Sequence, residues 1–415
     1  MADCRTSRAV SRRVFVKSGA TAMLSLGFAP SFLARTVEAA SARRRLLVAI
    51  FQRGAVDGLN MIVPFGEAEY YGLRRSIAIA KPGAPDGAIA LDDFFGFHPR
   101  MAPLKPLWDN GSLAVIHASG SHDRTRSHFD AQDYMETATP GVKSTRDGWL
   151  NRYLQASESD PTPLRGIAVA RQMPRTLQGR APALAFGGVE AFAIRGGMDS
   201  QRAVREAYEG AANPLLNAAA RDAFEAMETL RRTGTYQPAA GVQYPRSAFG
   251  QALQEIARVA KADVGLEVAF AESGNWDHHV NEGAAQGQLA QRLDDLSRGI
   301  AALAADLGER MADTVILTMS EFGRAAAENG NGGTDHGHGN AMMVIGGPVK
   351  GRQVYGRWPG LQPDQRFEGR DLAVTTDFRD VFSEVVVSHL GLTRDALARV
   401  FPGHTSTATL GILRA

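Results

Sequence analysis

The run Leu46-Leu47-Val48-Ala49-Ile50-Phe51, six apolar residues without a polar interruption, decides the fold class. A continuous run of this length is typical of a strand buried on both faces of a parallel sheet. Similar runs recur along the chain. They predict further strands over residues 113–116, 167–170, 183–186, 266–270, 314–319 and 341–345.

Helical patterns lie between several of these runs. Residues 203–232 and 248–261 are rich in Ala, Leu, Glu and Arg, with apolar residues three or four positions apart. Residues 286–310 carry the clearest apolar stripe, which consists of Leu289, Leu293, Leu296, Ile300, Leu303 and Leu307. Strands that alternate with such helices predict an α/β fold, with a three-layer, mostly parallel central sheet flanked by helices. Residues 234–245 are typical of a loop, and we expect a single domain over 43–415.

The first 42 residues have the parts of an export signal. The pair Arg12-Arg13 precedes a short apolar stretch over 18–29, and the small residues of 39–42 suit a signal peptidase. Adjacent arginines indicate the twin-arginine route, so we expect the twin-arginine translocase as a partner and a periplasmic or secreted mature protein. An amphipathic first helix is the alternative, which Pro30 disfavours. The stretch is also shorter than the roughly 20 apolar residues of a stable membrane span.

Removal of this segment changes the charge and the cysteine content. The 415-residue chain has a formal net charge of +2, and the predicted signal holds six positive and two negative side chains, which leaves about −2. A chain near neutrality has no electrostatic footprint for nucleic acid. The one cysteine, Cys4, lies in the signal, so the mature protein has no disulfide, thiolate ligand or cysteine nucleophile.

Polar segments follow four of the predicted strands, where ligands bind in sheets of this kind. They cover residues 52–60, 117–130, 272–279 and 320–339. Six of the ten histidines both fall there and lie close to an aspartate: His122, His128, His278, His279, His336 and His338. Imidazole with carboxylate and no thiolate is a ligand set for zinc, manganese or a similar divalent ion. We therefore predict a divalent metal ion as cofactor, zinc or manganese.

A single Asp/His pair is more often a turn residue beside a surface histidine, so the prediction depends on the recurrence of pairs after successive strands. Three glycines surround Asp335-His336 and would let the backbone approach a ligand closely: Gly333, Gly337 and Gly339. The alternative for this segment is a flexible surface loop.

Ser127 is the candidate nucleophile. It stands at the predicted start of a helix, with Asp130 three residues later, and this spacing also fits an ordinary capping box. In the functional interpretation, the helix N-terminus stabilises an anionic phosphate or sulfate beside the hydroxyl, and a metal lowers the pKa of that hydroxyl. Arg124 and Arg126 would then neutralise substrate oxygens, whereas Arg53 fits an ordinary solvated charge.

Five segments form a set that spans nearly the whole chain. They are Arg53-Gly54-x-x-Asp57-Gly58-Leu59-Asn60, Arg126-Ser127-His128-Phe129-x-x-Gln132, Asn275-Trp276-Asp277-x-His279, Ser320-Glu321-Phe322-Gly323-Arg324 and Gly333-Thr334-Asp335-His336-Gly337. Together with the signal, the set resembles the twin-arginine-exported bacterial proteins of domain-of-unknown-function family 1501, within the alkaline phosphatase and sulfatase superfamily.

This resemblance implies an alkaline phosphatase-like form of the predicted fold, and it implies roles for individual residues. Ser127 would be the nucleophile, with Arg126 beside it, and Glu321 would be either a metal ligand or a group that orients one. The implied metal ligands are Asp57, Asp277, His279, Asp335 and His336. A final histidine ligand is not evident from the motifs, and His338 is the nearest candidate.

The sequence departs from sulfatases in one respect. It has no Cys-x-Pro-x-Arg type motif, which argues against a formylglycine sulfatase. Two functions stay open: a metal-dependent hydrolase of phosphate or related oxyanion esters, with a small anionic ester as substrate, and a non-catalytic envelope binding or assembly protein that retains the fold. A membrane-surface protein has little support, since no basic amphipathic helix is evident after the signal.

Overall fold

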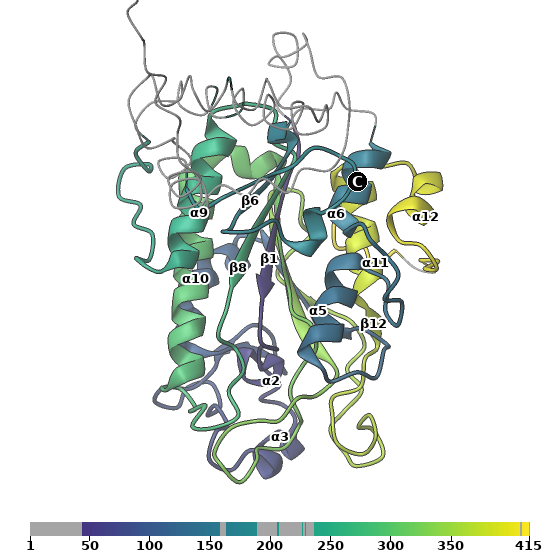
Figure 1. The fold of residues 1–415 in the computed structure, drawn as a ribbon. Helices are drawn as coiled ribbons and strands as arrows, with labels where there is room; N and C mark the ends of the chain where they lie inside the picture. Colours follow the sequence, from purple (N-terminus) through teal and green to yellow (C-terminus); the bar gives the residue numbers. More distant parts are fainter. Residues whose placement is uncertain are drawn as a thin grey trace, which may run out of the picture.

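The computed structural model in Figure 1 describes residues 44–157, 163–188, 236–406 and 409–414, with the isolated positions 206, 226 and 229. The predicted export signal over 1–42 lies outside these residues. The predicted helix over 203–232 also lies outside them, apart from the three isolated positions.

A central sheet runs through the molecule. Its strands are β1 (Leu46–Gln52), β5 (Leu113–Gly120), β6 (Gly166–Val169), β7 (Leu184–Phe186), β8 (Val268–Ser273), β9 (Thr314–Met319), β10 (Asn340–Gly346), β11 (Gln353–Tyr355) and β12 (Thr376–Asp377). Within the described residues the order is β11-β5-β10-β9-β1-β8-β6-β7, and β12 pairs with β5. A small antiparallel sheet of β2 (Ile62–Val63), β4 (Gly96–Phe97) and β3 (Ile89–Ala90) lies apart.

The central sheet is parallel except at β10, which runs antiparallel to both β5 and β9. Residues 320–339 join β9 to β10 without a crossover helix, and neighbouring strands joined in this way run antiparallel. All seven predicted strands are present. β8 starts two residues later than predicted, and β5 continues through Gly120, so that residues 117–120 belong to the strand and not to a loop.

Helices cover both faces of the sheet (Figure 1). On one side lie α4 (Lys105–Asp109), α9 (Ala248–Lys261) and α10 (Gln288–Leu307), and on the other α5 (His128–Thr137), α6 (Trp149–Ala156), α11 (Phe378–Glu384) and α12 (Leu397–Val400). The short α2 (Gly58–Met61) and α3 (Ala68–Leu73) lie beyond one end of the sheet. The predicted fold class, α/β with a three-layer, mostly parallel sheet flanked by helices, is confirmed.

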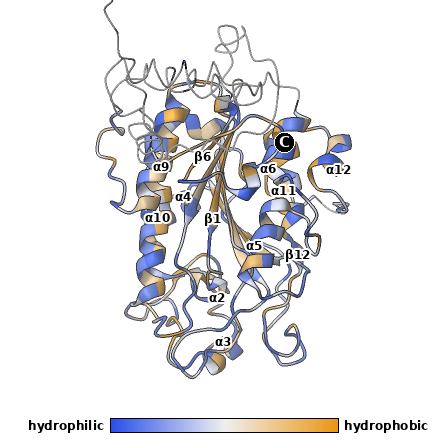
Figure 2. Cartoon of the chain, viewed as in Figure 1, coloured by the Kyte–Doolittle hydropathy of each residue, from blue (hydrophilic) through white to orange (hydrophobic). Residues whose placement is uncertain are grey.

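The core consists of two layers that the sheet separates. Side chains alternate along a strand, so Leu46, Val48 and Ile50 pack in one layer and Leu47, Ala49 and Phe51 in the other. The predicted stripe of α10 is buried in the first layer, where each buried leucine contributes about 1.5–3 kcal/mol of transfer free energy. Figure 2 shows the result, with apolar strands at the centre and helices that are polar on their outer sides.

The strand directions determine where the polar loops meet. β1, β8 and β9 are mutually parallel neighbours, and β5 has the same direction because β10 is antiparallel to both β9 and β5. The carboxyl ends of all four strands therefore lie at one edge of the sheet, which is the lower edge in Figure 1. The loops that follow these four strands carry the residues of the candidate site.

Candidate metal centre

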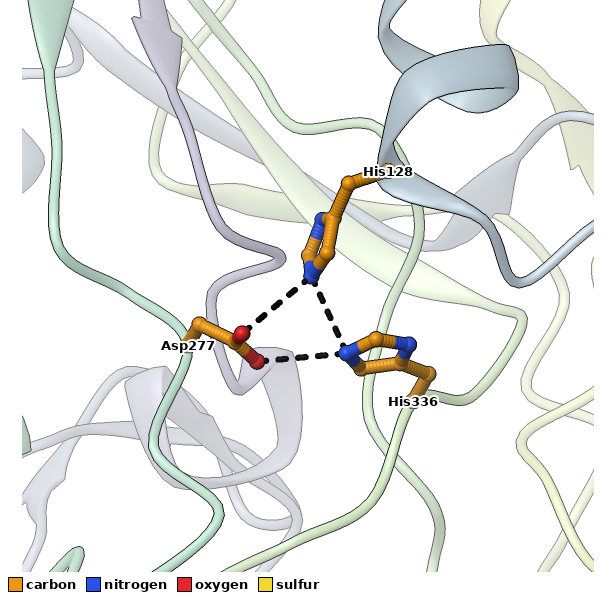
Figure 3. Close-up of side chains that lie close together, drawn as sticks. All are labelled: His128, Asp277 and His336. Carbon is orange, nitrogen blue, oxygen red and sulfur yellow. Dashed lines mark hydrogen bonds and ion pairs between the residues drawn. The ribbon is translucent and has the colours of Figure 1, made fainter.

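Four side chains from three of these loops form a group that we call the histidine–aspartate cluster: His128, Asp277, His279 and His336. Figure 3 shows three of them, with His128 at the start of α5, Asp277 in the loop after β8 and His336 in the loop between β9 and β10. His336 Nε2 lies 3.0 Å from His128 Nε2 and 2.9 Å from His279 Nε2. Asp277 Oδ1 lies 3.2 Å from His336 Nε2 and 3.0 Å from His279 Nε2.

The second ring nitrogen of each histidine contacts an oxygen that can only accept. His128 Nδ1 lies 2.8 Å from Glu321 Oε1, and His336 Nδ1 lies 2.8 Å from the carbonyl oxygen of Arg126. His279 Nδ1 lies 3.3 Å from Asp335 Oδ1. Each Nδ1 therefore carries the hydrogen in the neutral ring, and each Nε2 presents its lone pair to the cluster.

Lone pairs about 3 Å apart repel one another unless a cation lies between them. A proton on His128 satisfies its contact with His336 but leaves the contact between His336 and His279 without a hydrogen. The ligand atoms of His128, Asp277 and His336 all lie within 4.8 Å of one another. Nitrogen ligands about 2.0–2.1 Å from a tetrahedral zinc ion stand roughly 3.3 Å apart, close to the spacing seen here. The donor set therefore fits a divalent metal ion.

The surroundings of the cluster favour an ionised carboxylate at Asp277 and a neutral imidazole at His336. Burial opposes the charge of Asp277, but the hydrogen bond and charge of Arg324 prevail and lower its pKa to about 2. Burial lowers the pKa of His336, whereas the hydrogen bond that His128 donates to Glu321 raises the pKa of His128. Burial would raise the pKa of Glu321, yet donors that include His128 and Gln132 lower it. Glu321 is thus an ionised group that orients His128.

Arg324 joins three of the loops. The Arg324 side chain is fully buried. Its guanidinium donates to Asp277 Oδ1 at 2.7 Å and to the carbonyl oxygens of Ala55 at 2.7 Å and Thr334 at 3.2 Å. The loops after β1, β8 and β9 are therefore bound to one guanidinium. The sequence contains Arg324 in a motif, but its organising role was missed, because the acceptors are mostly backbone oxygens that no pattern of side chains reveals.

Two glycines let these loops approach closely. Gly54 has φ +115°, and a Cβ there would lie 2.8 Å from the backbone nitrogen of Asp277. A Cβ on Gly333 would lie 2.4 Å from the carbonyl carbon of His279. Both positions require glycine for backbone contact. Gly333 therefore packs against the loop after β8. This contact argues against the alternative of a flexible surface loop at Gly333.

Ser127 is the N-cap of α5, as predicted, but its side chain makes no capping hydrogen bond. The capping-box interpretation of its hydroxyl is therefore not supported. Both chain neighbours of Ser127 contact His336, Arg126 through its carbonyl oxygen and His128 through its ring. Ser127 thus lies at the edge of the cluster, at the N-cap of α5.

The remaining predicted residues have other partners. Asp57 is buried, accepts hydrogen bonds from the backbone of α2 and pairs with Arg74. The guanidinium of Arg126 binds Asp371 at 2.6 Å and Glu368 at 2.7 Å. The ring of His338 stacks on Phe367 at 4.0 Å, and burial lowers its pKa to about 4. Asp335 contacts the cluster through His279 Nδ1.

His128 is the cluster member that the sequence did not assign. It belongs to the six histidines near aspartates, and it directly follows Ser127 in a motif, which was the available signal. Of the other histidines in that group, His122 lies 4.0 Å from Asp377 and His278 is buried. Among the described residues, none of the helices has the length and apolar character needed to cross a membrane.

Two solved structures are similar to this chain at low sequence identity. The C-terminal periplasmic domain of EcEptC from Escherichia coli, solved as a complex with Zn, is 10% identical, with 74% of each chain covered and a TM-score of 0.38. The PsFucS1 sulfatase from Pseudoalteromonas sp. is 12% identical over 91% of this chain and 75% of that chain, with a TM-score of 0.38. Comparison with curated proteins gives no match. The family described as protein of unknown function (DUF1501) matches residues 44–395, most of the chain, so this protein belongs to that family.

Proposed function

We propose that this protein is an exported, metal-dependent hydrolase of phosphate or related oxyanion esters. The observation that carries the proposal is the convergence of three imidazole Nε2 atoms and one carboxylate at the edge of the sheet. Each Nδ1 is held by an acceptor, an arrangement typical of metal-bound histidines.

His128, Asp277, His279 and His336 would hold the metal, zinc or manganese. A bound ion of this kind supplies Lewis acidity, which lowers the pKa of a hydroxyl and stabilises negative charge on a substrate oxygen. Glu321 and Asp335 orient the rings of His128 and His279, and Arg324 keeps Asp277 ionised.

Ser127 is the proposed nucleophile. Its oxygen forms a bond to phosphorus while the bond between phosphorus and the ester oxygen breaks, and the hydroxyl proton passes to the departing alcohol. A water molecule then attacks the phosphoryl group, which restores the serine hydroxyl and releases inorganic phosphate. The first backbone N–H groups of α5 have no partner within the helix, and they stabilise the anionic group during both steps.

Metal analysis tests the proposal most directly. We expect about one equivalent of metal in the protein after loading with zinc or manganese, and none in the double variant Asp277→Ala, His336→Ala. The matched control is His404→Ala, which removes a histidine that also pairs with a carboxylate, at 2.9 Å from Asp380. A wild-type protein without stoichiometric metal would refute the hydrolase hypothesis.

Turnover of a panel of aryl phosphate monoesters, diesters and sulfates then tests the chemistry. Ser127→Ala should lower kcat by about a thousandfold or more and leave the metal content unchanged, because the hydroxyl is consumed in the bond-forming step. Full turnover by this variant would remove Ser127 from the mechanism.

Export by the twin-arginine translocase to the periplasm or the medium is part of the proposal. It is supported by the Arg12-Arg13 pair and its flanking segments, and it would let a folded protein receive its metal before release. Replacement of both arginines by lysine should retain the protein in the cytoplasmic fraction on immunoblots. Unchanged export of that variant would contradict this route.

One observation favours a second function, a non-catalytic envelope protein that retains the fold. Arg53 pairs with Glu136 and Glu272, and Arg126 pairs with Asp371 and Glu368, so that a substrate oxyanion would have to displace these carboxylates. Stoichiometric metal without turnover of any ester in the panel would support this function over the hydrolase.

A further inference from the structure

Two exposed large apolar side chains directly follow histidines of the histidine–aspartate cluster in the chain. Among the described residues, Phe129 is 92% exposed, Val280 is 50% exposed and Val142 is 45% exposed. Phe129 directly follows His128, and Val280 directly follows His279. Consecutive Cα atoms are about 3.8 Å apart, so Phe129 and Val280 lie at the edge of the cluster.

The position of Phe129 in its helix places this residue close to the candidate nucleophile. Phe129 is the second residue of α5, which begins at His128. Helical side chains tilt toward the N-terminus of their helix, and this end of α5 carries Ser127. A substrate group that contacts the Phe129 ring therefore lies next to the candidate nucleophile.

Val280 provides a second apolar surface, in the loop after β8. Its carbonyl oxygen accepts a hydrogen bond from Gln288 Nε2 at 2.8 Å, which ties the loop after β8 to the start of α10. The backbone of Val280 is thus anchored while its side chain stays half exposed.

We infer that Phe129, together with Val280, binds an apolar alcohol portion of the ester, so that the substrate class is phosphate or related esters of apolar alcohols. This inference rests on the proposed hydrolase function. Removal of an almost wholly exposed phenyl ring from water is favourable only with an apolar contact, and a polar alcohol such as glycerol offers none. Phe129 is therefore a specificity-determining residue, and the metal ligands play no part in this preference.

Selectivity between two substrates tests the inference. The measurement is kcat/KM for 1-naphthyl phosphate and for glycerol phosphate in the metal-loaded wild type, Phe129→Ala and Phe129→Leu. The control is Val142→Ala, because the Val142 side chain is exposed on the loop after α5. Phe129→Ala should lower the ratio of naphthyl to glycerol turnover by about tenfold through KM, and Phe129→Leu should restore part of it. Val142→Ala should keep the wild-type ratio. A ratio that is unchanged in Phe129→Ala overturns the inference and leaves the hydrolase function intact.

A binding measurement separates the inference from the proposed function. If the wild type hydrolyses neither substrate, the inference is tested by calorimetry, which measures the binding of 1-naphthylphosphonate to the metal-loaded protein. Binding that weakens in Phe129→Ala but not in Val142→Ala supports the apolar contact without catalysis. Binding that is absent or independent of Phe129 overturns it. Light scattering that shows a dimer for the wild type and a monomer for Phe129→Ala would also overturn the inference, because the ring would then be covered by a second copy of the chain.

Discussion

Two groups of acidic and basic side chains lie behind the same strand ends and differ in their exposure. Asp57, Arg74 and Glu282, which we call the buried carboxylate cluster, are at most 1% exposed. In the histidine–aspartate cluster, by contrast, the side chain of Asp277 is 44% exposed and that of His279 is 40% exposed.

The two groups also differ in how their polar atoms are partnered. Arg74 binds Asp57, the carbonyl oxygen of Ala326 and the side chain of Asn60, while Glu282 accepts from the hydroxyl of Thr334 at 2.8 Å. The charges and polar atoms of the buried carboxylate cluster are therefore matched by other groups of the protein. The histidine–aspartate cluster instead presents lone pairs to one another and to solvent. The first arrangement supports the fold, and the second suits an exchangeable cation.

Removal of the buried cation should have the largest effect. Arg74→Met leaves the carboxylate of Asp57 buried without its partner, so we expect the free energy of unfolding to fall by about 3–5 kcal/mol, measured by urea denaturation. The control is Arg298→Met on α10, which removes an exposed ion pair to Asp294 and should cost about 1 kcal/mol or less. Equal small losses in both variants would contradict the structural role of the buried cluster.

In the histidine–aspartate cluster, substitution of a carboxylate that contacts a proposed metal ligand should change metal affinity only. Glu321→Gln keeps an acceptor for His128 Nδ1 but removes the negative charge, so metal affinity should fall by about 10–100-fold in chelator competition. Asp335→Asn, behind His279, should have a smaller effect because the contact is 3.3 Å long and exposed. Unchanged affinity in Glu321→Gln would show that this carboxylate does not support a metal ligand.

The sequence was sufficient for the fold because burial on both faces of the sheet is visible in apolar runs. The run of 314–319 matches β9 residue for residue, and that of 248–261 matches α9. The antiparallel direction of β10 was not predicted, since its apolar run has the same appearance in either direction. Direction depends on the connection from β9, and no crossover helix lies in that connection.

The candidate site could be predicted only in part. Asp277, His279 and His336 lie together, because the order of strands brings their loops to one edge of the sheet. Asp57 follows a strand in the same way, yet Arg74, seventeen residues later, folds back to bind it. A partner of this kind depends on the path of α3 and its flanking loop, which sequence spacing does not reveal. His128 was not assigned as a ligand, because the predicted helix start at this point was interpreted through Ser127, the candidate nucleophile.

The smallest expected effect, when taken over a single pH unit, concerns the protonation of Glu282 in the buried carboxylate cluster. Burial, the charge of Asp57 and a hydrogen bond with Asp57 raise the pKa of Glu282 well above its ordinary value. Burial would also raise the pKa of Asp57, but Arg74 prevails and lowers it, so Asp57 stays ionised while Glu282 holds the proton. The folded protein thus binds a proton that the unfolded chain releases near pH 4.3.

Stability must therefore fall as the pH rises from that value toward the raised pKa of Glu282. Glu282→Gln retains a donor toward Asp57 and an acceptor for Thr334 at every pH, and it has no proton to lose. The stability of the wild type relative to this variant should fall by about 1.4 kcal/mol for each pH unit in this interval, measured by urea denaturation from pH 4 upward. Parallel stability profiles for the two proteins would mean that Glu282 is ionised in the folded state, and that the buried cluster is not neutralised by a shared proton.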